Sequence, residues 1–100
     1  MSDPQRTFII EVTSFDGVKT YYISKSSFVL GRGTTSEIKL DDKDISREHV
    51  RIFFSDALKI EDLESSNGTF INGIRIPAKS HVDILENDKI VLGQSKIAFK

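Results

Sequence analysis

The sequence of 100 residues contains no cysteine, which excludes disulfide bonds and metal sites built from thiolates. No apolar run approaches the roughly 18 residues that a membrane-spanning helix requires. The polar stretch 1–6 has no apolar segment behind it, so we expect no secretory signal peptide. These absences predict a cytoplasmic protein that does not act at a membrane.

Neither sign of charge is in excess, because 14 lysine and arginine residues stand against 15 aspartate and glutamate residues, giving a formal net charge of −1. Proteins that neutralise nucleic-acid phosphates are usually basic, so the sequence predicts no nucleic-acid partner. Any attraction for an anion must be local. The length suits one compact domain. We expect residues 7–100 to form it and residues 1–6 to be a flexible leader.

Short apolar runs separated by turn residues predict an all-β fold. The predicted strands are 8–12, 18–24, 28–30, 38–40, 50–54, 58–63, 70–71, 74–76, 90–92 and 97–99. The run 82–85 suits either a strand or a helical turn, and the sequence leaves that choice open. About ten short strands without an amphipathic helix favour a two-sheet β-sandwich, whose connecting loops cluster at its two ends.

Glycine-containing dipeptides mark the predicted turns. Asp16-Gly17 is expected to join the first two strands, since both residues tolerate positive φ. Asn67-Gly68 predicts a turn in a loop, and Asn72-Gly73 between two isoleucines is typical of a tight β-hairpin. The segment 93–95 is expected to turn the last hairpin.

Polar groups in the predicted loops are the candidate functional residues. They are Gly31-Arg32-Gly33, Ser46-Arg47-Glu48-His49, Ser66-Asn67-Gly68-Thr69 and Asn72-Gly73. A guanidinium beside glycines can offer a planar fork of donors to a phosphate, and an asparagine amide can clamp a peptide backbone. Taken singly, each group also suits an ordinary role: a solvated charge for Arg32, a structural histidine for His49 and a plain turn for Asn67-Gly68.

Two other chemistries are less well supported by the residues. Ser46 and His49 have a spacing that could suggest a nucleophile and its base, but no third group or oxyanion site is indicated, so we expect no enzyme. The acidic run 41–44 lacks the spacing, central glycine and closing glutamate of a calcium loop, so we interpret it as a solvated loop. We expect no metal, no cofactor and no small-molecule substrate.

Taken together, these groups resemble the forkhead-associated (FHA) domain. The matching segments are Gly31-Arg32, Ser46-Arg47-Glu48-His49, Ser65-Ser66-Asn67-Gly68-Thr69-Phe70 and Asn72-Gly73. The resemblance implies a β-sandwich of about eleven strands whose loops at one end bind phosphothreonine in a partner protein or peptide. It implies a signalling interaction module without enzymatic activity, of a kind that usually sits in a larger protein.

The resemblance also divides the candidate residues into two sets. The implied phosphopeptide-binding set is Arg32, Ser46, Arg47, Ser66 and Asn67. Asn67 is expected to bond the peptide backbone, and the other four to contact the phosphate. The implied loop-shaping set is Gly31, His49, Gly68, Asn72 and Gly73. The alternative is a structural or interaction domain of the same fold without phosphate recognition.

Two positions refine this expectation. Asn87-Asp88 stands where members of the family often carry Gly-Asp, which predicts a small difference in one loop. Asp44 lies two residues before Ser46, in a region that can contact the peptide beyond the phosphothreonine. Its charge is expected to disfavour acidic residues C-terminal to the phosphothreonine.

Overall fold

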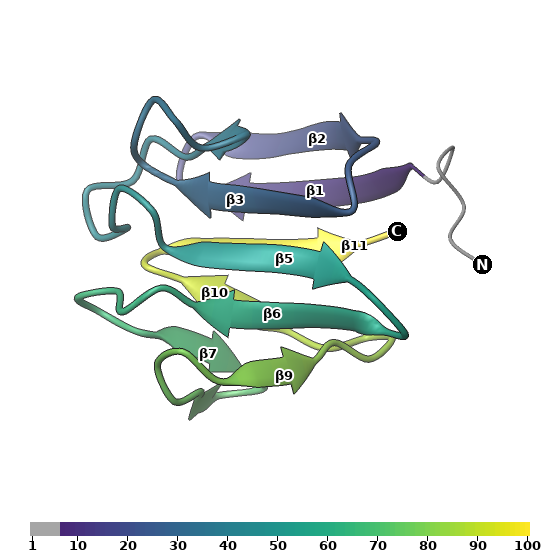
Figure 1. Ribbon diagram of the computed structural model, residues 1–100. Helices are drawn as coiled ribbons and strands as arrows, with labels where there is room; N and C mark the ends of the chain where they lie inside the picture. Colours follow the sequence, from purple (N-terminus) through teal and green to yellow (C-terminus); the bar gives the residue numbers. More distant parts are fainter. Residues whose placement is uncertain (1–6) are drawn as a thin grey trace.

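The computed structural model describes residues 7–100, which form eleven strands in two β-sheets packed face to face (Figure 1). Within these residues there is no helix, and hence none that is long and apolar enough to cross a membrane. The predicted all-β, two-sheet sandwich of about eleven strands is therefore confirmed. The expected leader, residues 1–6, lies outside the described residues.

Six strands form the first sheet, in the order β2-β1-β11-β10-β7-β8. Their bounds are β1 Phe8–Ser14, β2 Gly17–Ile23, β7 Thr69–Ile71, β8 Ile74–Arg75, β10 Ile90–Leu92 and β11 Ser95–Phe99. The second sheet has the order β4-β3-β5-β6-β9. Its strands are β3 Ser27–Gly31, β4 Ile38–Lys39, β5 Val50–Phe54, β6 Leu58–Asp62 and β9 His81–Asp83. All named strand pairs are antiparallel except β3 with β4.

The core lies between the two sheets and is made of alternate residues of each strand. Aliphatic side chains dominate it, and the fully or almost fully buried set is Ile10, Val12, Phe28, Leu30, Ile38, Leu40, Ile45, Val50, Ile52, Ile60, Ile76, Ile90, Leu92 and Ile97. The period-2 pattern in the sequence anticipates this alternation. Burial of one face fixes the register of each strand, because a slip of one residue would turn the apolar side chains to solvent.

In the hairpin turns the local sequence determines the backbone conformation. Asn72 and Gly73 both have positive φ (54° and 83°), which confirms the predicted tight hairpin between β7 and β8. The first hairpin differs by one residue from the prediction. Ser14 pairs with Gly17, so the turn residues are Phe15 and Asp16, and Gly17 begins β2 with φ of 120°.

The open choice for residues 82–85 is resolved as a strand followed by a turn. β9 pairs with β6, and the chain then turns at Leu85, whose N–H donates to Asp88 Oδ2 (2.8 Å). Asn87 adopts φ of 71° in this turn. Asparagine tolerates this left-handed conformation better than most residues, which explains how it can stand in place of the family's glycine.

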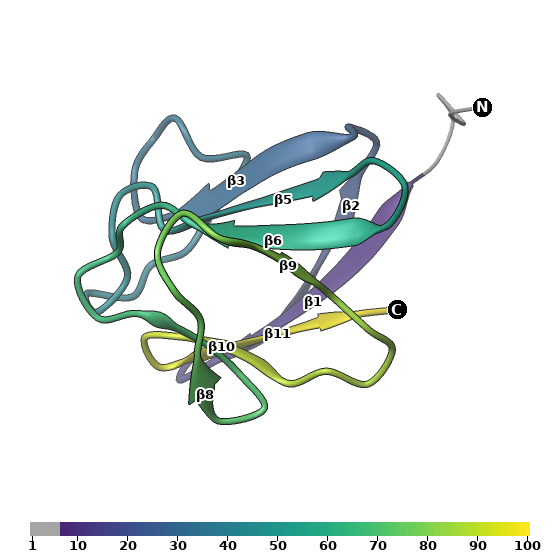
Figure 2. The same ribbon diagram turned by 60° about the horizontal axis from the view of Figure 1, so that its bottom comes forward.

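Four loops that carry or support the candidate residues lie together at one end of the sandwich, on the left of Figure 1 and again in the turned view of Figure 2. They join β3 to β4, β4 to β5, β6 to β7 and β10 to β11, and we call them the loop cluster. The sheets act as a rigid frame for these irregular segments.

The central position of β5 yields a stability prediction. Ile52 is fully buried and pairs with Phe28 on β3 and Ile60 on β6. Replacing it by alanine is expected to lower the free energy of unfolding by about 2–5 kcal/mol, because contacts are lost and a cavity remains. Urea denaturation would measure this. The exposed Val18→Thr on the edge strand β2 should change the value by less than about 0.5 kcal/mol, and an equal effect of the two variants would contradict the prediction.

Candidate functional site

Backbone hydrogen bonds join the β3–β4 loop to the β4–β5 loop. The N–H of Arg32 donates to the Ser46 carbonyl (2.9 Å), and the N–H of Gly33 donates to the Arg47 carbonyl (2.9 Å). Arg32 Nε also donates to the Ile45 carbonyl (3.0 Å), which anchors the inner edge of the guanidinium. Among the described residues its two terminal nitrogens have no partner, so they can donate to a ligand.

Gly31 permits this close approach of the two loops. A Cβ atom at this position would lie 2.0 Å from the Arg47 carbonyl oxygen, so any residue other than glycine would clash with the backbone of the neighbouring loop. Ser36 adds a second bond to the same carbonyl, with its hydroxyl donating over 3.0 Å. Gly31 therefore lies where the β3–β4 and β4–β5 loops approach most closely.

His49 connects the β4–β5 loop to the β6–β7 loop through both ring nitrogens. Nδ1 accepts from the Ser46 N–H (3.1 Å), and Nε2 donates to the Gly68 carbonyl (2.9 Å), so the ring must be the neutral tautomer protonated at Nε2. The side chain is fully buried. Burial lowers the pKa of His49, although the Gly68 carbonyl and nearby Asp62 and Asp42 oppose the shift.

Side chains complete the junction between the β4–β5 and β6–β7 loops. The Ser66 N–H donates to Ser46 Oγ (3.0 Å), and Asn67 Nδ2 donates to the Asp44 carbonyl (2.9 Å). Ser46 Oγ accepts here and keeps its own hydrogen to donate. Among the described residues, Ser66 Oγ and Asn67 Oδ1 have no hydrogen-bond partner, which leaves both open to a ligand.

Gly68 follows these residues with φ of 90°, which a residue with a side chain rarely adopts. A Cβ there would also come within 2.6 Å of Arg75 Nε. Glycine is therefore favoured at this position by its backbone conformation, and a side chain there would also displace the flexible Arg75 side chain.

A cleft of about 580 Å³ opens beside the junction. Its walls are Arg32, Gly33, Thr34, Thr35, Arg47 and Glu48. The Arg47 guanidinium has no hydrogen-bond or ion-pair partner in residues 7–100, and the acid in the wall, Glu48, accepts from Thr35 Oγ1 (3.4 Å). The structure thus brings Arg32, Ser46 and Arg47 to one surface, with Ser66 and Asn67 beside them.

Two buried carboxylates support the loops, and sequence reasoning assigned neither of them. Asp62 accepts from the N–H and the hydroxyl of Ser65 (both 3.1 Å), and that hydroxyl in turn accepts from the Gly68 N–H (3.0 Å). The signal was available, because Asp62 occupies an inward position of the strand alternation with Ile60. A carboxylate at such a position needs partners.

Asp42 corrects the interpretation of residues 41–44 as a solvated loop. It is buried, and its carboxylate accepts from the Asp44 N–H (2.9 Å), the Gln94 N–H (2.8 Å) and the Ser95 hydroxyl (2.9 Å). Burial alone would raise its pKa, but these three bonds to the ionised form outweigh burial and lower it. Within residues 7–100 no cluster of metal-ligating side chains is found.

Asn72 shapes a different part of the molecule from the loop cluster. Its Nδ2 donates to Asp88 Oδ1 (2.9 Å) and its Oδ1 accepts from the Lys89 N–H (2.9 Å). Asn72-Gly73 therefore fixes the β7–β8 hairpin against the β9–β10 loop. Its hydrogen bonds to Asp88 and Lys89 do not reach the surface around Ser46.

The FHA domain family model matches residues 28–93. FhaA of Mycobacterium tuberculosis is 31% identical over 80 residues, covering 79% of this chain and 15% of that protein. The chain spans about half or less of the curated relatives that it matches.

Solved structures give the same result for the fold. One, from a study of phosphothreonine-dependent FHA domain interactions, has a TM-score of 0.81 at 27% identity and covers 95% of this chain and 96% of its own. The FhaA FHA domain in complex with the intracellular domain of Rv3910 has a TM-score of 0.79 at 28% identity, covering 93% and 99%.

The buried ring of His49 generates a pH-dependent stability prediction. An unfolded histidine has a pKa of about 6.5, whereas burial lowers the pKa of His49 in the folded protein. As the pH falls below about 6.5, the unfolded chain takes up a proton that the folded protein does not. The free energy of unfolding should therefore decrease between pH 7.5 and pH 5.5. His49→Ala should remove this contribution and also lower stability by roughly 1–3 kcal/mol for each group left unpaired.

Urea denaturation at the two pH values would measure both effects. His81→Ala is the matched control, because His81 is exposed and lies outside the loop cluster. The control should keep most of the pH dependence. If His49→Ala retained the full pH dependence of the parent protein, the burial argument for His49 would be wrong.

Proposed function

The chain belongs to the FHA domain family, and we propose that it binds phosphothreonine in a partner protein and so joins two proteins only when one is phosphorylated. The observation that carries this proposal is the convergence of Arg32, Ser46 and Arg47 on one surface, with free donor groups on each. The similarity to structures from phosphothreonine-dependent FHA domain interactions supports it.

The chemistry of the phosphate matches these groups. A phosphothreonine carries about −1.5 to −2 charges and three acceptor oxygens. The terminal nitrogens of Arg32, the guanidinium of Arg47 and the hydroxyls of Ser46 and Ser66 supply donors of the kind that such oxygens need. Charge-assisted bonds contribute about 1.5–3 kcal/mol each, and association costs about 4–15 kcal/mol. For the four donor residues the net gain is then at most about 8 kcal/mol, so we expect binding no tighter than roughly micromolar from these contacts, which suits a reversible switch.

Asn67 has a separate role in the proposal. Its Nδ2 is held by the Asp44 carbonyl, and its Oδ1 is left as an acceptor. A backbone N–H of the bound peptide is the natural donor to this oxygen. Because the amide is already fixed before binding, little conformational entropy is lost when the peptide docks.

Catalysis is not part of the proposal, and the two hydrogen bonds of the His49 ring argue against it. His49 Nδ1 accepts from the backbone N–H of Ser46, and Nε2 is bonded to the Gly68 carbonyl. Neither nitrogen is therefore available to deprotonate the Ser46 hydroxyl, as a nucleophile would require.

The module is proposed to be part of a longer, cytoplasmic protein. Residues 7–100 would be the folded domain, since they include both complete sheets. The small share of the curated relatives that the chain spans supports the view that further segments accompany it. The proposed ligand supports a cytoplasmic location, because protein kinases that use ATP act in the cytoplasm.

Calorimetry would test the phosphate role directly. A peptide selected from a degenerate phosphothreonine library should bind at about micromolar Kd, and its unphosphorylated twin at least about 100-fold more weakly. Arg32→Ala should reduce affinity by about tenfold or more while the protein stays folded, because a charge-assisted donor is lost. Lys43→Ala, exposed in the β4–β5 loop, is the control. Full affinity in a folded Arg32→Ala protein would disprove the role of Arg32, whereas failure of the parent protein to bind any phosphothreonine peptide would favour a domain that does not recognise phosphate.

Asp44 should influence which peptides bind. Its carboxylate accepts from Gln94 Nε2 (2.8 Å), so a negative charge is held close to Ser46 and Asn67. We expect acidic residues C-terminal to the phosphothreonine to be depleted in peptides selected by the parent protein. In peptides selected by Asp44→Asn, acidic residues at these positions should be about two- to fivefold more frequent than in peptides selected by the parent protein. The effect is modest because solvent partly screens the charge that is removed. The exposed Asp41→Asn should leave it unchanged, and acidic enrichment three residues after the phosphothreonine would contradict the expectation.

A further inference from the structure

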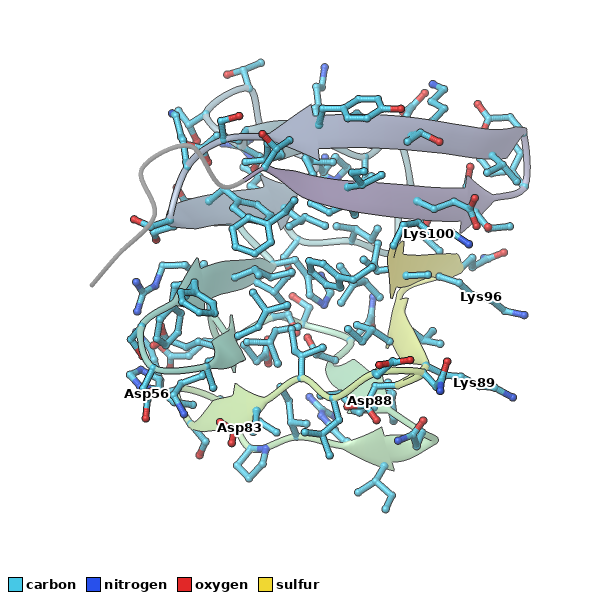
Figure 3. All side chains as sticks on the ribbon, turned by 90° about the vertical axis from the view of Figure 1, so that its right-hand side faces the viewer. Asp56, Asp83, Asp88, Lys89, Lys96 and Lys100 are labelled. Carbon is cyan, nitrogen blue, oxygen red and sulfur yellow. The ribbon has the colours of Figure 1, made fainter. Side chains whose placement is uncertain are left out.

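A second concave surface lies away from the loop cluster. It is a groove of about 850 Å³ between the β9–β10 loop, the start of β6 and strands β10 and β11. Figure 3 looks at this side of the molecule, which is the right-hand side of Figure 1. We call it the distal groove. The apolar side chains in its lining are Leu58, Ile84, Leu85, Ile90, Val91, Ile97, Ala98 and Phe99.

One apolar side chain of the lining is largely exposed to water. Leu85 is 67% exposed, although it is a large aliphatic residue. It is held in place by the turn in which Asp88 accepts from its N–H. Ile84 and Phe99 are partly buried at the edge of the core. Together they give the groove an apolar part that a side chain of a bound protein segment can cover.

Lysines give the distal groove its charge. Lys89, Lys96 and Lys100 all belong to its lining, and Figure 3 shows them along one side, apart from Asp56 and Asp83. Lys89 and Lys96 have no ion pair within residues 7–100, whereas Lys100 Nζ lies 3.5 Å from Glu11 Oε1. The local excess of positive charge contrasts with the formal net charge of −1 of the whole chain.

The acids in the lining offset only part of this charge. Asp88 has its carboxylate bonded within its own loop, where it accepts from the Leu85 N–H (2.8 Å) and from Asn72 Nδ2 (2.9 Å). Glu86 is then the one lining carboxylate without a hydrogen-bond or ion-pair partner among the described residues. Two unpaired ammonium groups, those of Lys89 and Lys96, are therefore available to an acidic ligand beside the apolar part of the lining.

We propose that the distal groove binds an unphosphorylated peptide segment of a partner protein, in which aliphatic or aromatic side chains are flanked by aspartate or glutamate. The apolar side chains would cover Leu85 and its neighbours, and the acids would pair with Lys89 and Lys96. A concave surface of this volume suits a few side chains, whereas a lipid bilayer is too flat to enter it. The module would then hold a phosphoprotein at the loop cluster and a second partner at the distal groove.

Peptide selection would test the proposal. A library of random, unphosphorylated 12-residue peptides displayed on phage would be selected against the parent protein. The enriched sequences should combine Leu, Ile or Phe with Asp or Glu. Their affinity should fall at least tenfold in the triple variant K89E/K96E/K100E and at least threefold in Leu85→Asp. Backbone amide shifts on titration should map to residues 84–91 and 96–100 and not to the loop cluster.

Matched controls separate this surface from the phosphate site. K19E/K39E/K43E changes the net charge equally at exposed lysines outside the groove and should retain the selected peptides. The groove variants should bind a phosphothreonine peptide within about threefold of the parent. If the phosphothreonine peptide bound neither the parent protein nor any variant, the proposed function would be wrong. The affinity of the selected peptides for the distal groove would still test the proposal made here.

Several outcomes would contradict the proposal that the distal groove binds a peptide. They are the absence of any enriched peptide, selected peptides without an acidic bias, equal affinity for the triple variant, or amide shifts confined to the loop cluster. Binding to phosphatidylserine vesicles that is lost in K89E/K96E/K100E, with no peptide enriched, would also overturn it and assign the surface to anionic lipid.

Discussion

Two hydrogen bonds of one buried ring hold the loop cluster in shape. His49 accepts from the Ser46 N–H on one side and donates to the Gly68 carbonyl on the other, so the β4–β5 and β6–β7 loops cannot move independently. The ring is fully buried, which makes the loss of either bond costly, since the backbone group left behind would be unsatisfied away from water. Each proposed phosphopeptide-binding residue lies within three residues of Ser46 or Gly68, except Arg32, which is hydrogen-bonded to the backbone of residues 45 and 46. The geometry of the proposed phosphate site therefore depends on His49, which is not one of the proposed phosphate-binding residues.

The support behind the loops explains how irregular backbone can remain fixed. Asp42 and Asp62 each lie buried and each accept a backbone N–H and a serine hydroxyl, so they replace the partners that a sheet would otherwise supply. Asp42 reaches the β10–β11 turn, and Asp62 reaches the residues just before Asn67. The loops are thus organised before a ligand arrives, which lowers the entropy that binding must overcome. Arg47 differs from Arg32 in this respect, because Arg32 is anchored through Nε and the Arg47 side chain has no bond in the described part of the chain.

The sequence predicted the features that depend on local pattern. Alternation around Ile52 identified β5, and Asn72-Gly73 identified a hairpin whose two central residues need positive φ. It did not predict features that depend on partners far along the chain. Asp42 seemed solvated because its partners, Gln94 and Ser95, lie more than 50 residues away and meet it only after both sheets pack. For the same reason no local signal showed that Asn72 would bond the β9–β10 loop. The FHA resemblance anticipated the junction around Ser46 because the family motifs record contacts that residue patterns alone do not.

The placement of charge would let a nearly neutral chain select the proposed phosphate ligand without attracting every polyanion. Arg32 and Arg47 share a wall of their cleft with Glu48, and Asp44 stands two residues before Ser46. At physiological ionic strength, charges beyond about 8 Å are largely screened, so the acids reduce the long-range positive potential more than they weaken donors in direct contact with a ligand. Nucleic acid, which is attracted mainly by extended positive surfaces, gains little here. A single dianionic group that fits between fixed donors gains the full set of short contacts. Specificity therefore comes from the fixed positions of a few donors, and those positions come from the buried ring and carboxylates behind them.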